Sequence, residues 1–291
     1  MNGLKVTIMM LGLMILFMWV GFLVGGQTGM IMAFVLAAVM NFFSYWYSAK
    51  MVLKMYKARE VTETDHPRLF RTVRRVATQA MIPVPKVYIV PNKAPNAFAT
   101  GRNLENAAVA VTEGLLELLS DDELEGVIGH EIAHIMNKDM LIGTIAATFA
   151  GAVGILASIA RWGAIFGGFG RGSNRGGGLG LLVAAIVAPI AAMLIQMAIS
   201  RQREFKADRI GGKITAKPLA LASALKKLHK APVGLNLGQR PATAQATAHL
   251  MIANPLSGKG IASLFSTHPP VEKRIALLEK QAYQSDYTPV S

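Results

Sequence analysis

The stretch that decides the fold is G-H-E-I-A-H-I-M-N-K-D, residues 129–139. Residues four apart in an α-helix lie on one face, so His130 and His134 can direct their imidazole nitrogens at one metal ion. Glu131 is their neighbour on the same turn, where its carboxylate can take a proton from a water molecule that the metal activates. The spacing therefore predicts a helix that supplies two metal ligands and a general base for hydrolysis.

The residues before this stretch predict where the helix begins. Ser120 and Glu123 have the spacing of a capping box, in which each side chain accepts a hydrogen bond from the backbone N–H of the other residue. Apolar residues then recur at helical spacing as far as the histidines. They are Leu124, Val127, Ile128, Ile132 and Ile135. This helical context makes the motif more specific than the five residues H-E-x-x-H alone.

A catalytic metal site needs a third protein ligand, and the chain has no cysteine to supply one or to form a disulfide. Asn137 and Asp139 are nearest in sequence, but on a continuous helix Asp139 would point away from His134. Glu204, in S-R-Q-R-E-F-K-A-D, is the better choice because Asp208 follows one turn later on the same face. Asp208 can then bond the outer nitrogen of a ligand histidine and fix its tautomer.

The composition is unusual for a cytosolic protein. Apolar residues make up 52% of the 291 residues and charged residues only 16%, while the formal net charge is +13. The Lys and Arg residues lie mostly beside apolar segments, which fits anionic lipid headgroups better than a nucleic-acid groove. No nucleic-acid recognition motif accompanies them. We therefore expect a lipid bilayer, and no nucleic acid, among the partners.

Two uncharged apolar runs, residues 6–26 and 29–48, are each long enough to cross a bilayer. The short link between them predicts a helical hairpin, and the aromatic run Tyr45, Trp46 and Tyr47 is typical of a membrane interface. Basic residues follow at once. They are Lys50, Lys54, Lys57 and Arg59. The positive-inside rule therefore places both chain termini and the metal site on the cytoplasmic side.

A second pair of apolar segments lies within residues 140–199, joined by a glycine-rich loop that carries Arg161, Arg171 and Arg175. These charges are unfavourable for a loop outside the cell membrane, so two arrangements stay open. Either the pair crosses the bilayer, which gives about four transmembrane helices, or it dips into the cytoplasmic leaflet. Glu204 can meet the histidines in both cases, because the number of crossings between them is even.

The remaining sequence predicts a mainly helical region with a small β-sheet. Residues 86–90 and 107–112 are short apolar runs typical of strands, and residues 91–106 between them are rich in turn formers. Further helices are predicted over residues 67–80, 201–213 and 218–230 and from Pro270 onward. The predicted regions are a transmembrane hairpin (1–49), a cytoplasmic catalytic region (50–139), the second membrane hairpin (140–199) and a cytoplasmic region with the third ligand (200–291).

Several ordered blocks, together with the paired N-terminal runs, extend the pattern well beyond the pentapeptide. They are P-N-A-F-A-T-G, A-V-A-V-T-E-G-L-L, L-S-D-D-E-L-E-G-V-I-G-H-E-I-A-H-I-M-N-K-D, S-R-Q-R-E-F-K-A-D and T-H-P-P-V-E-K-R-I. Over nearly its whole length the chain resembles the HtpX-type membrane zinc metalloproteases, which are related to the CAAX prenyl proteases. The fold class we expect is a mainly α integral membrane protein with a small β-sheet in a cytoplasmic zincin-like catalytic domain.

The resemblance implies a role for each metal-site residue. His130, His134 and Glu204 match the family's ligands for one Zn²⁺ per chain, and Glu131 matches its catalytic base. The implied activity is hydrolysis of peptide bonds in damaged or misfolded membrane proteins, or in unfolded polypeptides. It would take place at the cytoplasmic face of the cell inner membrane, in a multi-pass protein linked to stress response and protein quality control.

The resemblance implies two further site elements. One is an edge strand near the metal, where an extended substrate could add a strand. Its residues are Asn96, Ala97, Phe98 and Ala99. The other is His268, which matches a histidine that the family places where it could stabilise an oxyanion. From the sequence alone, Asn96 can equally be a turn residue and His268 a residue at a helix start.

Two other functions remain open. A non-catalytic membrane protein could hold a structural zinc ion, but such a site normally has four protein ligands and needs no base such as Glu131. A CAAX-type prenyl-protein protease would share the motif, although members of that branch carry more membrane spans than this chain shows. The sequence does not indicate an oligomeric state.

Overall fold

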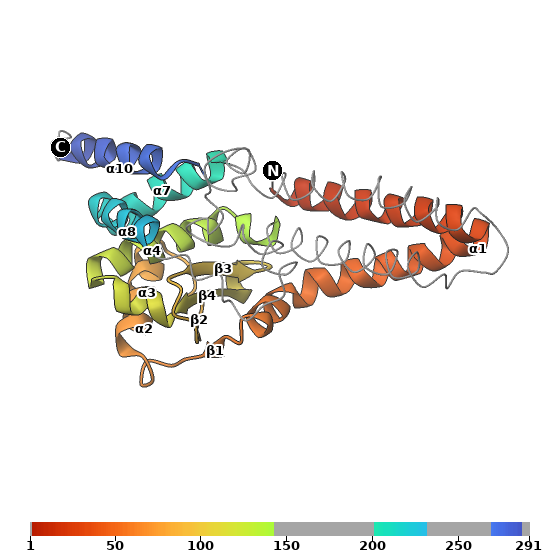
Figure 1. The fold of residues 1–291 in the computed structure, drawn as a ribbon, viewed down its shortest axis with the longest axis horizontal. Helices are drawn as coiled ribbons and strands as arrows, with labels where there is room; N and C mark the ends of the chain where they lie inside the picture. The colour runs from red at the N-terminus through yellow and green to blue at the C-terminus, as the bar shows by residue number, and fades with distance from the viewer. Residues whose placement is uncertain (1, 143–200, 232–268, 287–291) are drawn as a thin grey trace. The chain divides into compact units, whose positions relative to one another are not determined.

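A computed structural model describes residues 2–142, 201–231 and 269–286 (Figure 1). The described residues fall into two compact units. Residues 2–48 form the first. Residues 49–142, 201–231 and 269–286 form the second, which we call the sheet unit because it contains the β-sheet. All residues of the predicted metal site that the structure describes lie in the sheet unit.

Helix α1 (Asn2–Met55) is a helical hairpin, as predicted. The chain turns at Gly25 and Gly26, and Gly26 has φ 59° and ψ −145°, a conformation that only glycine adopts readily. The second arm contains an apolar stretch, Gly25–Tyr47, whose 23 residues are long enough to cross a membrane. The first arm contains a shorter apolar stretch, Val6–Phe22.

The sheet has four strands in the order β1-β2-β4-β3. Their bounds are β1 Arg59–Glu60, β2 Lys86–Val90, β3 Ala97–Gly101 and β4 Ala107–Thr112. Strands β2 and β4 pair in parallel, whereas β1 and β3 each pair antiparallel with their neighbour. The predicted bounds of β2 and β4 are confirmed. Within the turn-rich residues 91–106, β3 forms one edge of the described sheet, which confirms the edge strand that the family resemblance implied and that local composition alone did not indicate.

The predicted helices are present. They are α2 Pro67–Gln79, α4 Asp121–Met136, α7 Arg201–Thr215, α8 Pro218–Lys230 and α10 Val271–Asp286, with the shorter η1 Leu104–Asn106 and α3 Glu113–Leu118. The capping box is confirmed, because Ser120 Oγ accepts from the Glu123 amide and Glu123 Oε2 accepts from the Ser120 amide 2.8 Å away. Helix α4 therefore begins where the sequence predicted.

The sheet separates two apolar clusters. On one face, alternate strand residues such as Ala97, Ala99 and Val109 join the main core, which helix α4 shares through Val127 and Ile128. The other face packs against the end of α1, with members Val52, Leu53, Tyr56, Val90, Phe98, Ala108 and Ala110. Helix α4 lies in the middle of the main core, in contact with α2, α7, α8 and the sheet (Figure 1). The histidine motif is therefore held by packing on several sides.

Two glycines allow α4 and α7 to approach closely. A Cβ on Gly211 would lie 2.7 Å from the backbone carbonyl carbon of Gly129 and 2.7 Å from the amide nitrogen of His130. A Cβ on Gly129 would lie 2.7 Å from the side chain of Thr215. Only hydrogen atoms fit at these contacts, so the backbones of the two helices touch at the position of the first histidine.

Two predictions fall outside the described residues. The second membrane hairpin (140–199) is described only at its first residues, up to Ile142, and His268 lies in the range 232–268. Whether the second hairpin crosses the bilayer or dips into it, and the total of about four transmembrane helices, stay predictions. The predicted boundaries of the four regions stay predictions as well.

Candidate metal centre

His130, His134 and Glu204 form a compact cluster, with one ligand atom of each residue within 4.8 Å of the others. The Nε2 atoms of the two histidines lie 3.2 Å apart. Glu204 Oε2 is 3.7 Å from His130 Nε2, and Glu204 Oε1 is 3.5 Å from His134 Nε2. Helix α4 supplies the two nitrogens and helix α7 supplies the carboxylate, as the sequence predicted.

These distances fit a tetrahedral metal ion. Two ligand atoms that are each about 2.0–2.1 Å from a tetrahedral zinc ion lie about 3.3 Å from one another. The two histidine nitrogens, 3.2 Å apart, match this value, and each lies 3.5 or 3.7 Å from a different oxygen of Glu204, so the carboxylate faces the same point as the two imidazoles. Two imidazole nitrogens and one carboxylate are also a common ligand set of catalytic zinc, in which the fourth position is left for water or substrate. The described residues therefore fit a catalytic zinc ion.

His130 is oriented by a buried carboxylate. Asp208 Oδ1 lies 2.9 Å from His130 Nδ1, as predicted, which leaves Nε2 directed at the cluster. Arg274 on α10 donates from Nε to Asp208 Oδ2 and from Nη2 to Asp208 Oδ1, both at 2.7 Å. The Arg274 side chain is fully buried. A guanidinium in this two-bond arrangement fixes the carboxylate, and through it the plane of the imidazole ring.

His134 has a carboxylate partner of its own, which the sequence prediction excluded. Asp139 Oδ2 lies 3.3 Å from His134 Nδ1, and the opposite oxygen of Asp139 lies 4.0 Å from Arg203 Nε. The prediction that Asp139 points away was wrong because α4 ends at Met136. Lys138 then adopts φ 57°, in the left-handed region, and turns the chain back toward the histidine.

The charges around the cluster favour a cation. Burial opposes a charge on His134, but its hydrogen bond with Asp139 and the charges of the surrounding carboxylates raise its pKa to about 9. Burial also opposes ionisation of Asp208, but the guanidinium of Arg274 and the bond with His130 hold its pKa at about 2. A site that stabilises a proton on imidazole is one in which a metal cation can take the place of that proton.

The other predicted site residues lie in two places. Glu131 is 4% exposed and follows His130 on α4, close enough for its charge to act on His134. The stretch 96–99 leads into and forms most of β3, and all five residues of this strand are buried. Ala97 and Ala99 face the main core, whereas the Phe98 ring packs against Tyr56 on the other face of the sheet, with 5.1 Å between ring centroids. A role of these residues in substrate binding stays a prediction.

The chain is similar to known peptidases over the range that contains these residues. The model of peptidase family M48 matches residues 63–282, which include all three cluster residues and Glu131. The chain belongs to peptidase family M48. An M48 relative, the protease HtpX homolog of Desulfatibacillum aliphaticivorans, is 53% identical over 291 residues, covering 99% of this chain and 92% of the relative. The HtpX homolog of Persephonella marina is 53% identical over 277 residues, covering 95% of this chain and 96% of the relative.

A solved structure shares the fold. The crystal structure of Ste24p from S. mikatae aligns with a TM-score of 0.51 at 18% identity, covering 84% of this chain and 57% of that one. At this identity the likeness concerns the fold alone. The match to family M48 and the HtpX relatives together show that the chain is a membrane metalloprotease. This confirms the function that the sequence predicted.

Proposed function

We propose that this M48 protease is a zinc endopeptidase whose single Zn²⁺ is held by His130, His134 and Glu204. The observation that carries the proposal is the cluster itself: the two histidine nitrogens lie 3.2 Å apart, both oxygens of the Glu204 carboxylate face them, and Glu131 is adjacent on the same helix. A structural zinc site normally has four protein ligands. Within the described ranges the cluster contains three, together with a buried carboxylate that a structural site does not need.

The chemistry divides between the metal and the protein. When bound, zinc supplies Lewis acidity, which makes water a better nucleophile at neutral pH and polarises the peptide carbonyl. Glu131 takes a proton from the attacking water and passes it to the leaving amine. Asp208 and Asp139 keep the two imidazoles in the tautomer that presents Nε2. His268, in T-H-P-P, would hydrogen-bond the developing oxyanion, as the family resemblance implies.

The backbone of β3 suits an extended substrate. The carbonyl of Asn96 accepts from the amide of Thr112 on the β4 side, 2.9 Å away. Backbone groups alternate along an antiparallel strand, so the N–H and C=O groups of Ala97 and Ala99 point away from β4. These groups could pair with a substrate strand. Because β3 is buried, this pairing requires that whatever covers the edge moves aside.

We propose membrane-protein segments and unfolded polypeptides as substrates, cleaved at the cytoplasmic face of the cell inner membrane. The apolar stretch Gly25–Tyr47 and the lysines that follow it support this placement under the positive-inside rule. A multi-pass topology with about four helices and a role in stress response belong to the same proposal. Ste24p shares the fold, so a prenyl-protein protease is the second candidate, and a prenylated peptide is the substrate that distinguishes it.

The test compares wild type with Glu131→Gln, both purified in detergent. We expect both proteins to hold zinc, and only the wild type to cleave casein. Removal of zinc by a chelator should abolish cleavage, and added Zn²⁺ should restore it. Equal cleavage by the two proteins, or an active wild type that contains no metal, would refute the proposal. Faster cleavage of a prenylated C-terminal peptide than of casein would favour the second candidate.

A further inference from the structure

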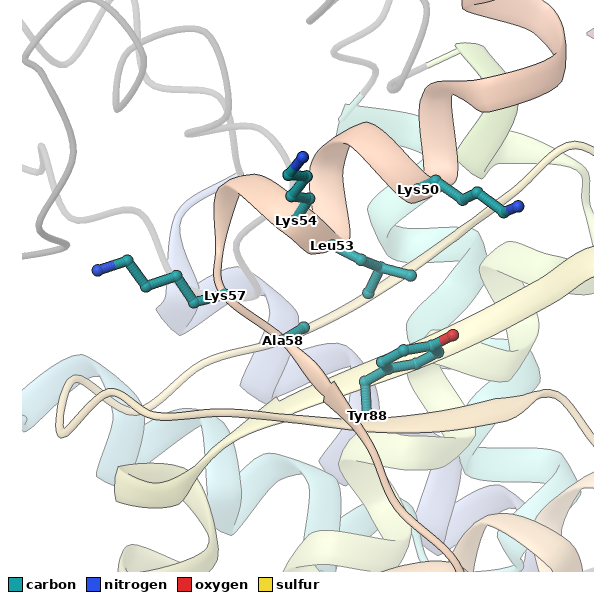
Figure 2. Close-up of a pocket in the computed structure, with 6 residues that line it drawn as sticks. All are labelled: Lys50, Leu53, Lys54, Lys57, Ala58 and Tyr88. Atoms are coloured by element: carbon teal, nitrogen blue, oxygen red, sulfur yellow. The ribbon is translucent and has the colours of Figure 1, made fainter.

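The end of α1 and strand β2 enclose an open hollow of about 540 Å³ in the sheet unit (Figure 2). Its lining residues are Lys50, Leu53, Lys54, Lys57, Ala58 and Tyr88. Leu53, Ala58 and the Tyr88 ring supply apolar surface, and the three lysine side chains extend in different directions from the last turns of the helix (Figure 2). The hollow is far in sequence from the metal ligands, and the proposed peptidase chemistry does not use it.

The hollow is lined by three basic side chains and no acidic ones. Among the described residues, no carboxylate forms a salt bridge with Lys54 or Lys57, and both side chains are exposed. Glu60, the nearest acid in sequence, is already paired with Lys86 at 3.0 Å and accepts from the Tyr88 hydroxyl at 2.9 Å. The pKa of Tyr88 is raised to about 12 by burial and by Glu60, so the phenol stays neutral. An anion is therefore the complementary ligand.

The backbone beneath the lysines is well fixed. The amide of Lys57 donates to the carbonyl of Lys54 at 3.0 Å, and the amide of Ala58 donates to the carbonyl of Leu53 at 2.9 Å. Together with φ 52° at Lys57, these bonds make a Schellman motif that ends α1. The lysines thus project from a defined helix end, not from a loop.

The position of the lysines in the sequence indicates which kind of anion binds in the hollow. Lys50 follows Tyr47, the end of the apolar stretch, by three residues, and Lys57 follows it by ten. At the helical rise Lys50 and Lys54, both within α1, lie roughly 5 and 10 Å beyond the apolar stretch along the helix, which overlaps the headgroup layer of a bilayer. Met51 and Met55, between the lysines, are exposed apolar side chains suited to the boundary between headgroups and acyl chains. A small soluble anion would have to order the exposed side chains of Lys54 and Lys57, whereas lipid phosphates are concentrated in this layer.

We propose that this hollow binds the phosphate of an anionic phospholipid headgroup. The lipid would hold the β1–β2 side of the sheet at the membrane surface, while the proposed substrate strand pairs at β3, the opposite edge of the sheet. This site is independent of the zinc chemistry, so its test can use the inactive Glu131→Gln chain throughout.

The experiment measures retained lipid by native mass spectrometry of the full chain in nanodiscs that contain phosphatidylglycerol and phosphatidylcholine. We expect the chain to retain phosphatidylglycerol preferentially, and Lys54→Gln with Lys57→Gln to lower its affinity roughly thirtyfold, as the loss of two interfacial lysines implies. The matched control is Lys230→Gln with Lys280→Gln, which removes the same charge at exposed positions on α8 and α10. It should retain lipid as the unsubstituted chain does, and Lys54→Arg with Lys57→Arg should too.

Three results would overturn the proposal. The first is equal retention of the two lipids by the unsubstituted chain. The second is an equal loss of phosphatidylglycerol in the Lys54→Gln, Lys57→Gln variant and in the control variant, since net charge alone would then explain binding. The third is displacement of the lipid by inorganic phosphate at no more than the lipid's own concentration, since the hollow would then prefer a soluble anion. An unchanged thermal unfolding midpoint in every variant shows that the fold is intact, so that lost lipid binding cannot be attributed to misfolding.

Discussion

Asp139 Oδ2 lies 3.3 Å from His134 Nδ1, although the two residues are five positions apart and could not meet on one continuous helix. The contact exists because α4 ends at Met136 and Lys138 adopts a left-handed conformation. His130 has a corresponding partner in Asp208. Each histidine ligand is therefore held by a carboxylate on its Nδ1 side, and each carboxylate faces an arginine, Arg203 or Arg274.

Asp139→Asn should weaken zinc binding while leaving the ligands in place. Loss of a carboxylate that orients a ligand histidine typically lowers metal affinity by about 10–100-fold. Competition with a chromophoric chelator measures the affinity directly, without reference to activity. Glu105→Gln, an exposed acid in η1, is the control and should bind zinc as the wild type does. An affinity of Asp139→Asn equal to that of the control would show that the contact has no positioning role.

Gly211→Ala should separate the two ligand helices. Its Cβ would lie 2.7 Å from backbone atoms of α4, and overpacking of this kind costs about 1–3 kcal/mol. We expect zinc affinity to fall because Glu204 moves with α7. The neighbouring Gly212→Ala is the control, since its nearest contact is the flexible end of Gln281 at 3.0 Å. The same zinc affinity in both alanine variants would contradict this account of the helix contact.

Arg274→Gln should destabilise the sheet unit. The guanidinium is buried with Asp208, and removing one partner of a buried pair typically costs about 3–5 kcal/mol. The shift in the urea midpoint of the zinc-free protein in detergent measures this cost without a contribution from the metal. Adding Asp208→Asn to the variant should recover part of the loss, because the unpaired charge disappears. A midpoint unchanged in Arg274→Gln would be inconsistent with the pair as described.

Ala99→Pro should raise the KM for extended peptides and leave zinc content unchanged. The amide of Ala99 points away from β4, so proline removes a donor that pairs with substrate and not one that holds the sheet. Thr100→Pro is the comparison, because its amide faces β4 and its loss should reduce folding yield. If Ala99→Pro cleaves extended peptides with an unaltered KM, strand addition at this edge is not how substrates bind.

Local signals in the sequence predicted much of this fold. The capping box at Ser120 predicted the start of α4, and short apolar runs predicted β2 and β4. These elements could be predicted because each depends on residues that are close together in the sequence. Strand β3 lies among turn-forming residues and was identified only through the family resemblance. Its pairing with β4 decides its structure, and local composition does not report that pairing.

Two residues of the metal centre were missed for different reasons. Asp139 was excluded because a lysine gives no signal for the left-handed turn at position 138, where glycine is the usual residue. Arg274 stands in the block T-H-P-P-V-E-K-R-I, but 66 residues separate it from Asp208. Only packing of α10 against α7 brings the two together. The one sign in the sequence that Arg274 is buried with a partner is its place in the helix, at a position where the helical spacing calls for an apolar residue.

The zinc content of Glu204→Gln tests the central claim most directly. Wild type, Glu131→Gln and Glu204→Gln are purified in parallel without chelator. The metal content per chain is then measured by inductively coupled plasma mass spectrometry. We predict about one zinc ion per chain in the first two proteins and a large loss in Glu204→Gln, because one of three protein ligands has been replaced by a poor one. Full zinc occupancy in Glu204→Gln would contradict the assignment of the third ligand, and with it the metal centre described above.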